Sequence, residues 1–104
     1  MRSRWVIVVV GAAIVGGCSQ SPSDPLADRG RQIYLAQCTQ CHATDSSQPG
    51  PVGPPIRGSS RELLEAKILK GTYPPGYKPK RPTSVMPPQP AVAPEIPALA
   101  AYLK

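Results

Sequence analysis

Apolar residues recur at the three- and four-residue spacing of a helix in three separate parts of the chain. The first part predicts a helix from Pro25 to about Ala36, because Asp24 is a good N-cap and Pro25 suits the first helical position. The residues that fall near one face of this helix are Leu26, Gly30, Ile33, Tyr34 and Gln37. Glycine weakens a helix interior, so we expect Gly30 to permit close approach by another helix, the alternative being a tolerated weak position.

A second helix is predicted from Ser60 to Lys70. The sequence Ser59-Ser60-Arg61-Glu62 matches a capping box, and Gly71 is a typical helix terminator. The apolar stripe of this helix consists of Leu64 and Ile68, with Leu63, Ala66 and Leu69 beside them.

The third helix is predicted from about Pro94 to Leu103. Pro94 suits a first helical turn, whereas Ala93 is a poor N-cap. Pro97 cannot donate a backbone hydrogen bond, so a later start is the alternative. The expected packing face is Ile96, Leu99, Ala100 and Leu103, with Tyr102 flanking it.

The segments between these helices are predicted to be loops. Glycines and prolines between Ala43 and Gly58 exclude a regular element there. The stretch from Thr72 to Val92 is basic and proline-rich, which by composition alone would suggest a disordered linker. Its place between two helices favours a stiff loop instead, because prolines reduce the entropy that the loop loses on closing. The prolines of this stretch are Pro74, Pro75, Pro79, Pro82, Pro87, Pro88 and Pro90.

The amino-terminal residues have the layout of an export signal. Arg2 and Arg4 form a basic start, an apolar run extends from Trp5 to Val15, and small residues precede Cys18. A retained membrane anchor is the alternative, although the apolar run is short for a membrane span.

The sequence Val15-Gly16-Gly17-Cys18 resembles the lipobox of bacterial lipoproteins. This resemblance implies cleavage before Cys18 and acylation of its sulfur, which would anchor the chain to a membrane. We therefore predict a signal peptide over residues 1–17, a lipidated cysteine and linker over 18–25, and one domain over 26–104. The alternative for Cys18 is a free or disulfide-bonded thiol.

The stretch Cys38-Thr39-Gln40-Cys41-His42 follows the C-x-x-C-H pattern of c-type haem attachment. Two thiols at this spacing can form thioether bonds to the vinyl groups of one haem, and His42 can then ligate the iron. The alternatives are a redox C-x-x-C motif and half of a zinc site. A thioredoxin-like motif expects a βαβ pattern, which is not visible, and zinc needs about four ligands. Beyond Cys18 the chain has no other Cys or His to supply them.

The same counts restrict the sixth iron ligand. The chain has 1 His and 2 Met, and Met1 lies in the predicted leader, so Met86 is the available thioether. A methionine ligand suits electron transfer. The alternatives are an open or weakly held distal site and a gap-filling core role for Met86. Pro87 and Pro88 disfavour a core helix or strand at this point, which favours the ligand role.

The net charge of the chain only weakly restricts the kinds of partner that it can bind. The full chain carries +6; loss of Arg2 and Arg4 with the leader leaves ten basic and six acidic side chains, a net charge of +4 before haem propionates are counted. Such a surface can steer encounter with an acidic redox partner. Nucleic acid is excluded as a partner, because the basic residues are scattered and no Phe or Trp remains to stack on bases.

From about Leu26 to Lys104 the chain resembles a small class I cytochrome c. The residues that carry this resemblance are, in order, Gly30, Tyr34, Cys38, Cys41, His42, Gly53-Pro54, Gly71, Met86-Pro87 and Ala101-Tyr102-Leu103. The resemblance implies an all-α fold of three main helices around one covalently bound haem, with His42 and Met86 as axial ligands. It also implies that Gly30 packs against Tyr102 and that the Pro54 carbonyl orients His42. Pro97 and the proline-rich, basic stretch between Gly71 and Met86 depart from the family pattern.

The resulting expectation is one-electron transfer between redox proteins by an exported, lipid-anchored cytochrome on the periplasmic side of a bacterial membrane. No residue is expected to perform acid–base catalysis. Two alternatives stay open: a cytochrome subunit of an oxidoreductase complex, and a haem protein that binds a small ligand such as nitric oxide or carbon monoxide.

Overall fold

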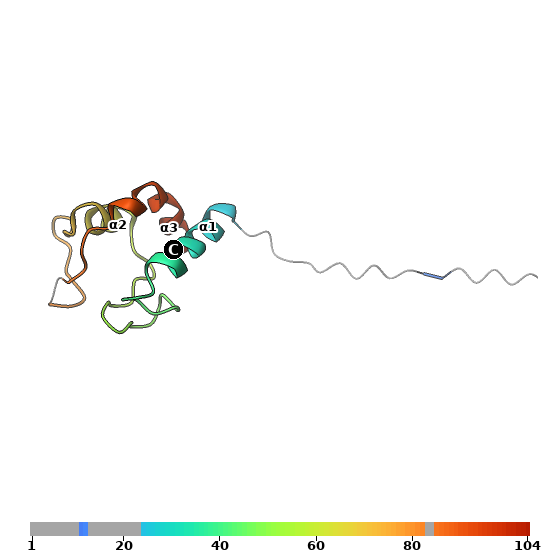
Figure 1. Cartoon of the computed structure of the whole chain (residues 1–104), viewed down its shortest axis with the longest axis horizontal. Coiled ribbons are helices and arrows are strands. Elements are labelled where there is room, and N and C mark those ends of the chain that lie inside the picture. Colours follow the sequence, from blue (N-terminus) through green and yellow to red (C-terminus); the bar gives the residue numbers. More distant parts are fainter. Residues whose placement is uncertain (1–10, 13–23, 83–84) are drawn as a thin grey trace, which may run out of the picture.

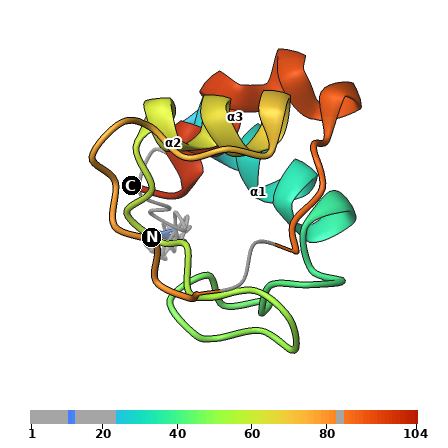
Figure 2. The same ribbon diagram turned by 90° about the vertical axis from the view of Figure 1, so that its left-hand side faces the viewer.

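The computed structural model describes residues 11–12, 24–82 and 85–104. Its regular elements over these ranges are all helical, and they are α1 (Pro25–Gln37), α2 (Arg61–Glu65), the π-helical turn η1 (Ala66–Lys70), the 3₁₀ turn η2 (Pro90–Glu95) and α3 (Ile96–Tyr102). Figure 1 shows their order along the chain. Figure 2 shows the three α-helices gathered on one side of the domain, with the loop of residues 43–58 on the opposite side. The predicted all-α fold of three main helices is therefore confirmed.

Helix α1 begins as its sequence predicts. The Asp24 side chain accepts a hydrogen bond from the Leu26 N–H at 3.0 Å, and Pro25 occupies the first turn. Only Gly30 and Tyr34 of this helix are buried, so the expected packing face is shorter than its periodicity suggests. Leu26 at its start is 48% exposed and lies outside the core.

The crossing of α1 and α3 depends on Gly30. A Cβ atom at this position would lie 2.0 Å from the Ala98 carbonyl oxygen and 2.8 Å from Tyr102 Cβ, so the two backbones are in direct contact. The expected close approach and the pairing of Gly30 with Tyr102 are confirmed. Arg29 also forms an ion pair with Glu95 at 2.7 Å, which lowers the pKa of that carboxyl through a hydrogen bond. Because this pair is exposed, it contributes little compared with the backbone contact.

The second predicted helix differs from the structure at both ends. It begins at Arg61 with Ser60 as its N-cap, whose side chain accepts from the Leu63 N–H, so the capping box expected from Ser59 does not form. The Ser59 hydroxyl instead donates to the Ile56 carbonyl. The last five residues, Ala66–Lys70, form a π-helical rather than an α-helical turn.

The π-helical turn is closed by the residues that follow it. Gly71 adopts a left-handed conformation with φ of 66°, which suits glycine, and its N–H bonds to the Lys67 carbonyl at 3.0 Å. The Thr72 N–H reaches back to the Ala66 carbonyl at 3.1 Å. The Gly71 bond has the ordinary four-residue spacing, whereas the Thr72 bond spans six residues and gives the Ala66 carbonyl a partner beyond the helix end.

The third predicted helix is split by its prolines. The chain is already helical from Pro90, in the 3₁₀ turn η2, so the predicted loop ends at Gln89 and not at Val92. The α-helix itself begins at Ile96, later than the expected Pro94. In an α-helix that begins at Pro94, Pro97 would lack the N–H needed to bond the Ala93 carbonyl, and in the structure the Ile96 N–H bonds that carbonyl instead. Pro97 falls instead in the first turn of α3, where its missing donor is tolerated.

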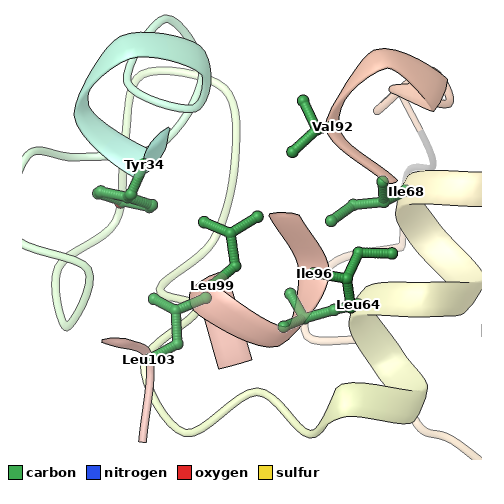
Figure 3. Close-up of a cluster of buried hydrophobic side chains, with 7 residues drawn as sticks. All are labelled: Tyr34, Leu64, Ile68, Val92, Ile96, Leu99 and Leu103. Atoms are coloured by element: carbon green, nitrogen blue, oxygen red, sulfur yellow. The ribbon is translucent and has the colours of Figure 1, made fainter. Parts of the chain in front are cut away.

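One core cluster joins these elements, and Figure 3 shows its side chains meeting between α1, α2 and α3. Its buried members are Tyr34, Leu64, Ile68, Val92, Ile96, Leu99 and Leu103. The predicted packing positions on the second and third helices are thus largely confirmed. Leu69, expected beside the stripe, is 44% exposed. Within the described parts of the chain, no helix is both long and apolar enough to cross a membrane.

Gly30→Ala should lower the free energy of unfolding by about 1–3 kcal/mol, because the added methyl group collides with backbone atoms that cannot rotate away. Helix propensity alone would predict the opposite, a gain of about 1 kcal/mol. Denaturant titration followed by circular dichroism measures the difference. Gln32→Ala, at an exposed position of the same helix, is the matched control and should change stability by about 0.5 kcal/mol or less. An unchanged or more stable Gly30→Ala protein would contradict the contact.

Candidate functional site

The residues proposed from the sequence for haem binding line one cavity of about 270 Å³. Cys38, Cys41 and His42 enter it from the end of α1, Pro54 from the loop that follows, and Met86 from the segment before η2. The remaining wall is mostly apolar and includes core residues of α2, η1 and α3. Five residues that are up to 48 positions apart in the sequence therefore share one site.

The C-x-x-C-H segment continues the direction of α1 by one further turn. Cys38 is the C-cap of α1, and its N–H bonds to the Tyr34 carbonyl at 2.9 Å. The His42 N–H then bonds to the Cys38 carbonyl at 3.0 Å. Residues three and four apart in such a turn lie on the same side, so Cys38, Cys41 and His42 all face the cavity.

The His42 ring is buried and fixed from one side by backbone. Its Nδ1 lies 2.9 Å from the Pro54 carbonyl oxygen, and a carbonyl can only accept, so Nδ1 carries the proton. Nε2 is then the nitrogen with a lone pair for a metal. Gly53 makes room for the ring, because a Cβ there would lie 2.3 Å from His42 Cε1 and 2.5 Å from Nδ1.

Backbone hydrogen bonds hold the loop of residues 43–58, here called the histidine loop because it packs against His42, against the C-x-x-C-H turn. The Cys41 carbonyl accepts from both the Val52 N–H at 3.2 Å and the Gly53 N–H at 2.7 Å. A Cβ at Gly50 would lie 2.3 Å from the Cys41 oxygen, so only glycine fits this approach. The glycines of this loop thus serve close backbone packing.

Tyr34 closes the site from the core side. Its hydroxyl donates to the Ala43 carbonyl, just beyond His42, and its ring lies 5.6 Å from the Tyr102 ring. Burial is the main cause that raises the pKa of Tyr34 to about 12. The phenol therefore stays a neutral donor and links α1, α3 and the C-x-x-C-H turn.

Burial also raises the pKa of the Cys38 thiol to about 11. This sulfur is therefore uncharged at neutral pH, unlike the thiolates of reactive or zinc-binding cysteines. No cluster of three or more His, Cys, Asp or Glu side chains able to hold a metal ion occurs in the described ranges. An environment that favours a neutral sulfur fits a thioether better than a thiolate ligand.

Met86 lies in a segment tied to the end of η1. It is half-buried, lines the cavity and packs against the core cluster. The Gln89 N–H bonds to the Ile68 carbonyl at 2.7 Å, and Pro88 packs on Gly71, where a Cβ would lie 3.2 Å from Pro88 Cδ. These contacts hold the chain on the carboxyl side of Met86 next to the helix whose apolar face lines the cavity.

Three basic side chains of the cavity wall were not anticipated from the sequence. Lys80 donates to the Pro55 carbonyl at 2.8 Å and Arg81 donates to the Val52 carbonyl, so the proline-rich loop is tied to the histidine loop. Lys67 is buried on η1. Its position was readable, because it follows Leu64 by three residues and precedes Ile68 on the same helical face. Lys80 and Arg81 gave no comparable signal, since their loop lacks periodicity.

The donor set and the walls fit a covalently attached haem. Two thiols, one imidazole oriented for metal binding and one thioether surround a largely apolar space, which is the chemistry of c-type haem attachment and His/Met ligation. Cys18, the predicted lipidation site, lies outside the described residues, as does most of the predicted leader.

Comparison with known proteins supports a cytochrome c domain through a family model and a curated relative. The family model described as "Cytochrome C oxidase, cbb3-type, subunit III" matches residues 25–103. Among curated proteins, the chain is 40% identical over 60 residues to "Cbb3-type cytochrome c oxidase subunit FixPc" of Rhizobium leguminosarum bv. viciae. That alignment covers 57% of this chain and 19% of the relative. Among solved structures, cytochrome cL from Hyphomicrobium denitrificans matches with a TM-score of 0.48 and 22% identity, over 75% of this chain and 45% of that one.

Cytochrome c domains of this kind bind haem c covalently, carry electrons and generally work outside the cytoplasm. Cys38 and Cys41 fit the attachment motif of that cofactor. Because the family model spans nearly the whole described domain, this chain belongs to the family of cbb3-type cytochrome c oxidase subunit III and is a small class I, mono-haem cytochrome c.

Proposed function

We propose that the chain is a membrane-anchored one-electron carrier whose haem is bonded to Cys38 and Cys41 and ligated by His42 and Met86. The observation that carries this proposal is the convergence of these four side chains on one apolar cavity. The bound haem supplies a metal centre that takes up and releases one electron. Everything else is supplied by the protein, which holds the ligands and excludes water.

Each residue has a separate task in this proposal. Cys38 and Cys41 fix the cofactor by thioether bonds, so that it cannot dissociate. His42 offers Nε2 to the iron while its Nδ1 proton is held by the Pro54 carbonyl, which fixes the ring plane and raises the basicity of the ligand. Met86 offers a thioether, which favours ferrous iron and raises the reduction potential.

The electron-transfer partners are proposed to be redox proteins with acidic docking surfaces. The basic side chains support this, because Lys78 and Lys80 are exposed on the proline-rich loop beside the cavity. The family and the relative described as an oxidase subunit favour one specific setting, in which the chain delivers electrons within or to a terminal oxidase complex. Co-purification with a larger oxidase subunit separates this setting from that of a free carrier.

Anchoring is proposed to occur through acylated Cys18 at the outer side of the cytoplasmic membrane or another membrane facing the periplasm. The lipobox-like sequence before Cys18 supports this proposal, and the extracytoplasmic setting of cytochrome c domains agrees with it. Seven residues between Cys18 and Leu26 would reach about 20 Å if extended, at about 3.1 Å each. The cytochrome domain would then work close to the membrane surface.

Met86→Ala should remove the weak sulfur-to-iron absorption band of the ferric protein near the red edge of the visible spectrum. It should lower the reduction potential by more than about 59 mV, a tenfold change in the one-electron equilibrium, because thioether ligation favours the ferrous state. Carbon monoxide should then bind the reduced protein. Spectra and redox titration of the holoprotein measure these effects.

Ala91→Ser, at an exposed position of η2 outside the cavity lining, is the control and should leave the band and the potential unchanged. If the Met86→Ala protein keeps both the sulfur-to-iron band and the wild-type reduction potential, Met86 is not the ligand. If the wild-type reduced protein already binds carbon monoxide readily, the alternative function of a small-ligand binder is favoured over that of a carrier.

Cys18→Ser should abolish acylation and release the cytochrome domain from the membrane, or leave it held only by an uncleaved leader. Membrane fractionation and mass spectrometry of the amino terminus measure both outcomes. Ser23→Ala, in the same predicted linker, should remain acylated and membrane-bound. Recovery of wild-type mature protein with an unmodified Cys18 thiol would disprove the lipid anchor.

A further inference from the structure

One lysine is buried in the wall of the haem cavity. Lys67 on η1 is only 9% exposed, whereas Lys80, which lines the same cavity, is exposed and Arg81 is half-buried. Lysine is rarely buried in proteins, because removing an ammonium group from water is costly unless specific groups compensate. A buried lysine among cofactor-binding residues therefore needs a physical explanation.

The fold places Lys67 there through the period of its helix. Leu64 and Ile68 are buried members of the core, and Lys67 lies three residues after the first and one before the second. All three positions share the face that α2 and η1 turn toward the cavity. The side chain cannot avoid this face without displacing Leu64 and Ile68 from the core.

One tyrosine of the proline-rich loop contacts the ammonium group, and a second tyrosine stacks on the first. Lys67 Nζ lies 4.4 Å from the centre of the Tyr73 ring, which is the geometry of a cation–π contact. The Tyr73 ring stacks on Tyr77, with centroids 5.4 Å apart and an interplanar angle of 11°. Both rings line the cavity. The aromatic faces offset part of the desolvation cost and retain the positive charge at the cavity wall.

The charge of the cavity wall has one sign. Among the described residues, its ionised side chains are Lys67, Lys80 and Arg81, and no aspartate or glutamate lines it. A charge on a buried side chain acts through a medium of low effective dielectric constant, so its influence on a neighbouring charge is stronger than that of an exposed one. It is also less screened by salt.

We propose that Lys67 is a tuning residue that raises the reduction potential of the haem in this cavity. One-electron reduction by a partner protein lowers the charge inside the cavity by one unit, while no bond forms or breaks. A nearby fixed positive charge stabilises the state with less positive charge, so it favours the reduced form. This inference rests on the proposed placement of haem in the cavity, but not on the identity of the sixth ligand.

The test is an equilibrium redox titration of the holoprotein at low and high salt. Lys67→Met removes the charge and keeps most of the volume, and the equilibrium constant for reduction should fall by about tenfold, or about 59 mV for one electron. Lys67→Arg keeps a cation that can stack on Tyr73 and should stay near the wild-type potential. Lys78→Met removes a charge from an exposed position of the same loop outside the cavity lining, and its smaller effect should fade at high salt.

Three results would overturn the proposal. The first is a Lys67→Met potential equal to that of wild type. The second is an equal fall of the potential in Lys67→Met and Lys67→Arg, and the third is a fall accompanied by loss of the ferric sulfur-to-iron band. In the last two cases Lys67 would shape the loop without acting through its charge. If Lys67→Met does not fold, Lys67→Gln supplies the neutral variant. A wild-type protein without that band would refute Met86 ligation, yet the potentials of the charged and neutral Lys67 variants would still decide this inference.

Discussion

The contact of α1 with α3 at Gly30 is the constraint on which the rest of the domain depends. A Cβ at Gly30 would overlap the Ala98 carbonyl, so the two helices meet backbone to backbone. This contact fixes the axis of α1 against the core, and α1 ends at the cavity with the C-x-x-C-H turn. Tyr34, one helical turn after Gly30, then connects the same helix to Tyr102 and to the carbonyl of Ala43. The position of the haem-binding turn thus follows from a packing contact far from the cofactor itself.

The two long loops are held by a different kind of interaction. They contain no strand or helix of their own over residues 43–58 and over the described part of 72–89, so ladder hydrogen bonds cannot stabilise them. The histidine loop is fixed by paired N–H groups on the Cys41 carbonyl, and the proline-rich loop by Lys80 on Pro55 and Gln89 on Ile68. Prolines reduce the number of conformations that such a loop must give up. A few specific bonds can therefore position Met86 although the loop lacks regular structure.

The sequence predicted those parts of the structure that local rules determine. Asp24, Pro25 and the apolar face of the third helix acted as expected, because caps and periodicity depend on neighbours in the sequence. Pro94 and Pro97 indicated that the third helix is interrupted, but they did not indicate that the preceding turn is a 3₁₀ helix. The π-helical turn could not be predicted, because it depends on Gly71 and Thr72 folding back on Ala66. The contact of Lys67 with Tyr73 could not be predicted, because Tyr73 reaches Lys67 only through the fold of the proline-rich loop. Haem attachment was readable because the C-x-x-C-H pattern is contiguous, whereas Lys80 and Arg81 reach the cavity only through tertiary structure.

The distribution of charge around the cavity separates two tasks that a redox protein must perform. The side that holds the cofactor presents no lysine, arginine or carboxylate: it consists of Cys38, whose surroundings favour neutral sulfur, the Tyr34 phenol and the His42 ring, which the Pro54 carbonyl fixes. These groups fix geometry without favouring either oxidation state through a net charge. The cations include Lys67 on η1, which is buried, and Lys80 on the proline-rich loop, which is exposed. A buried cation biases the equilibrium of electron uptake, and an exposed one acts mainly on encounter with a charged partner. One loop contributes both Tyr73, whose ring contacts Lys67, and the exposed Lys78 and Lys80. Changes in its sequence can therefore alter driving force and docking without disturbing the helices that hold the haem.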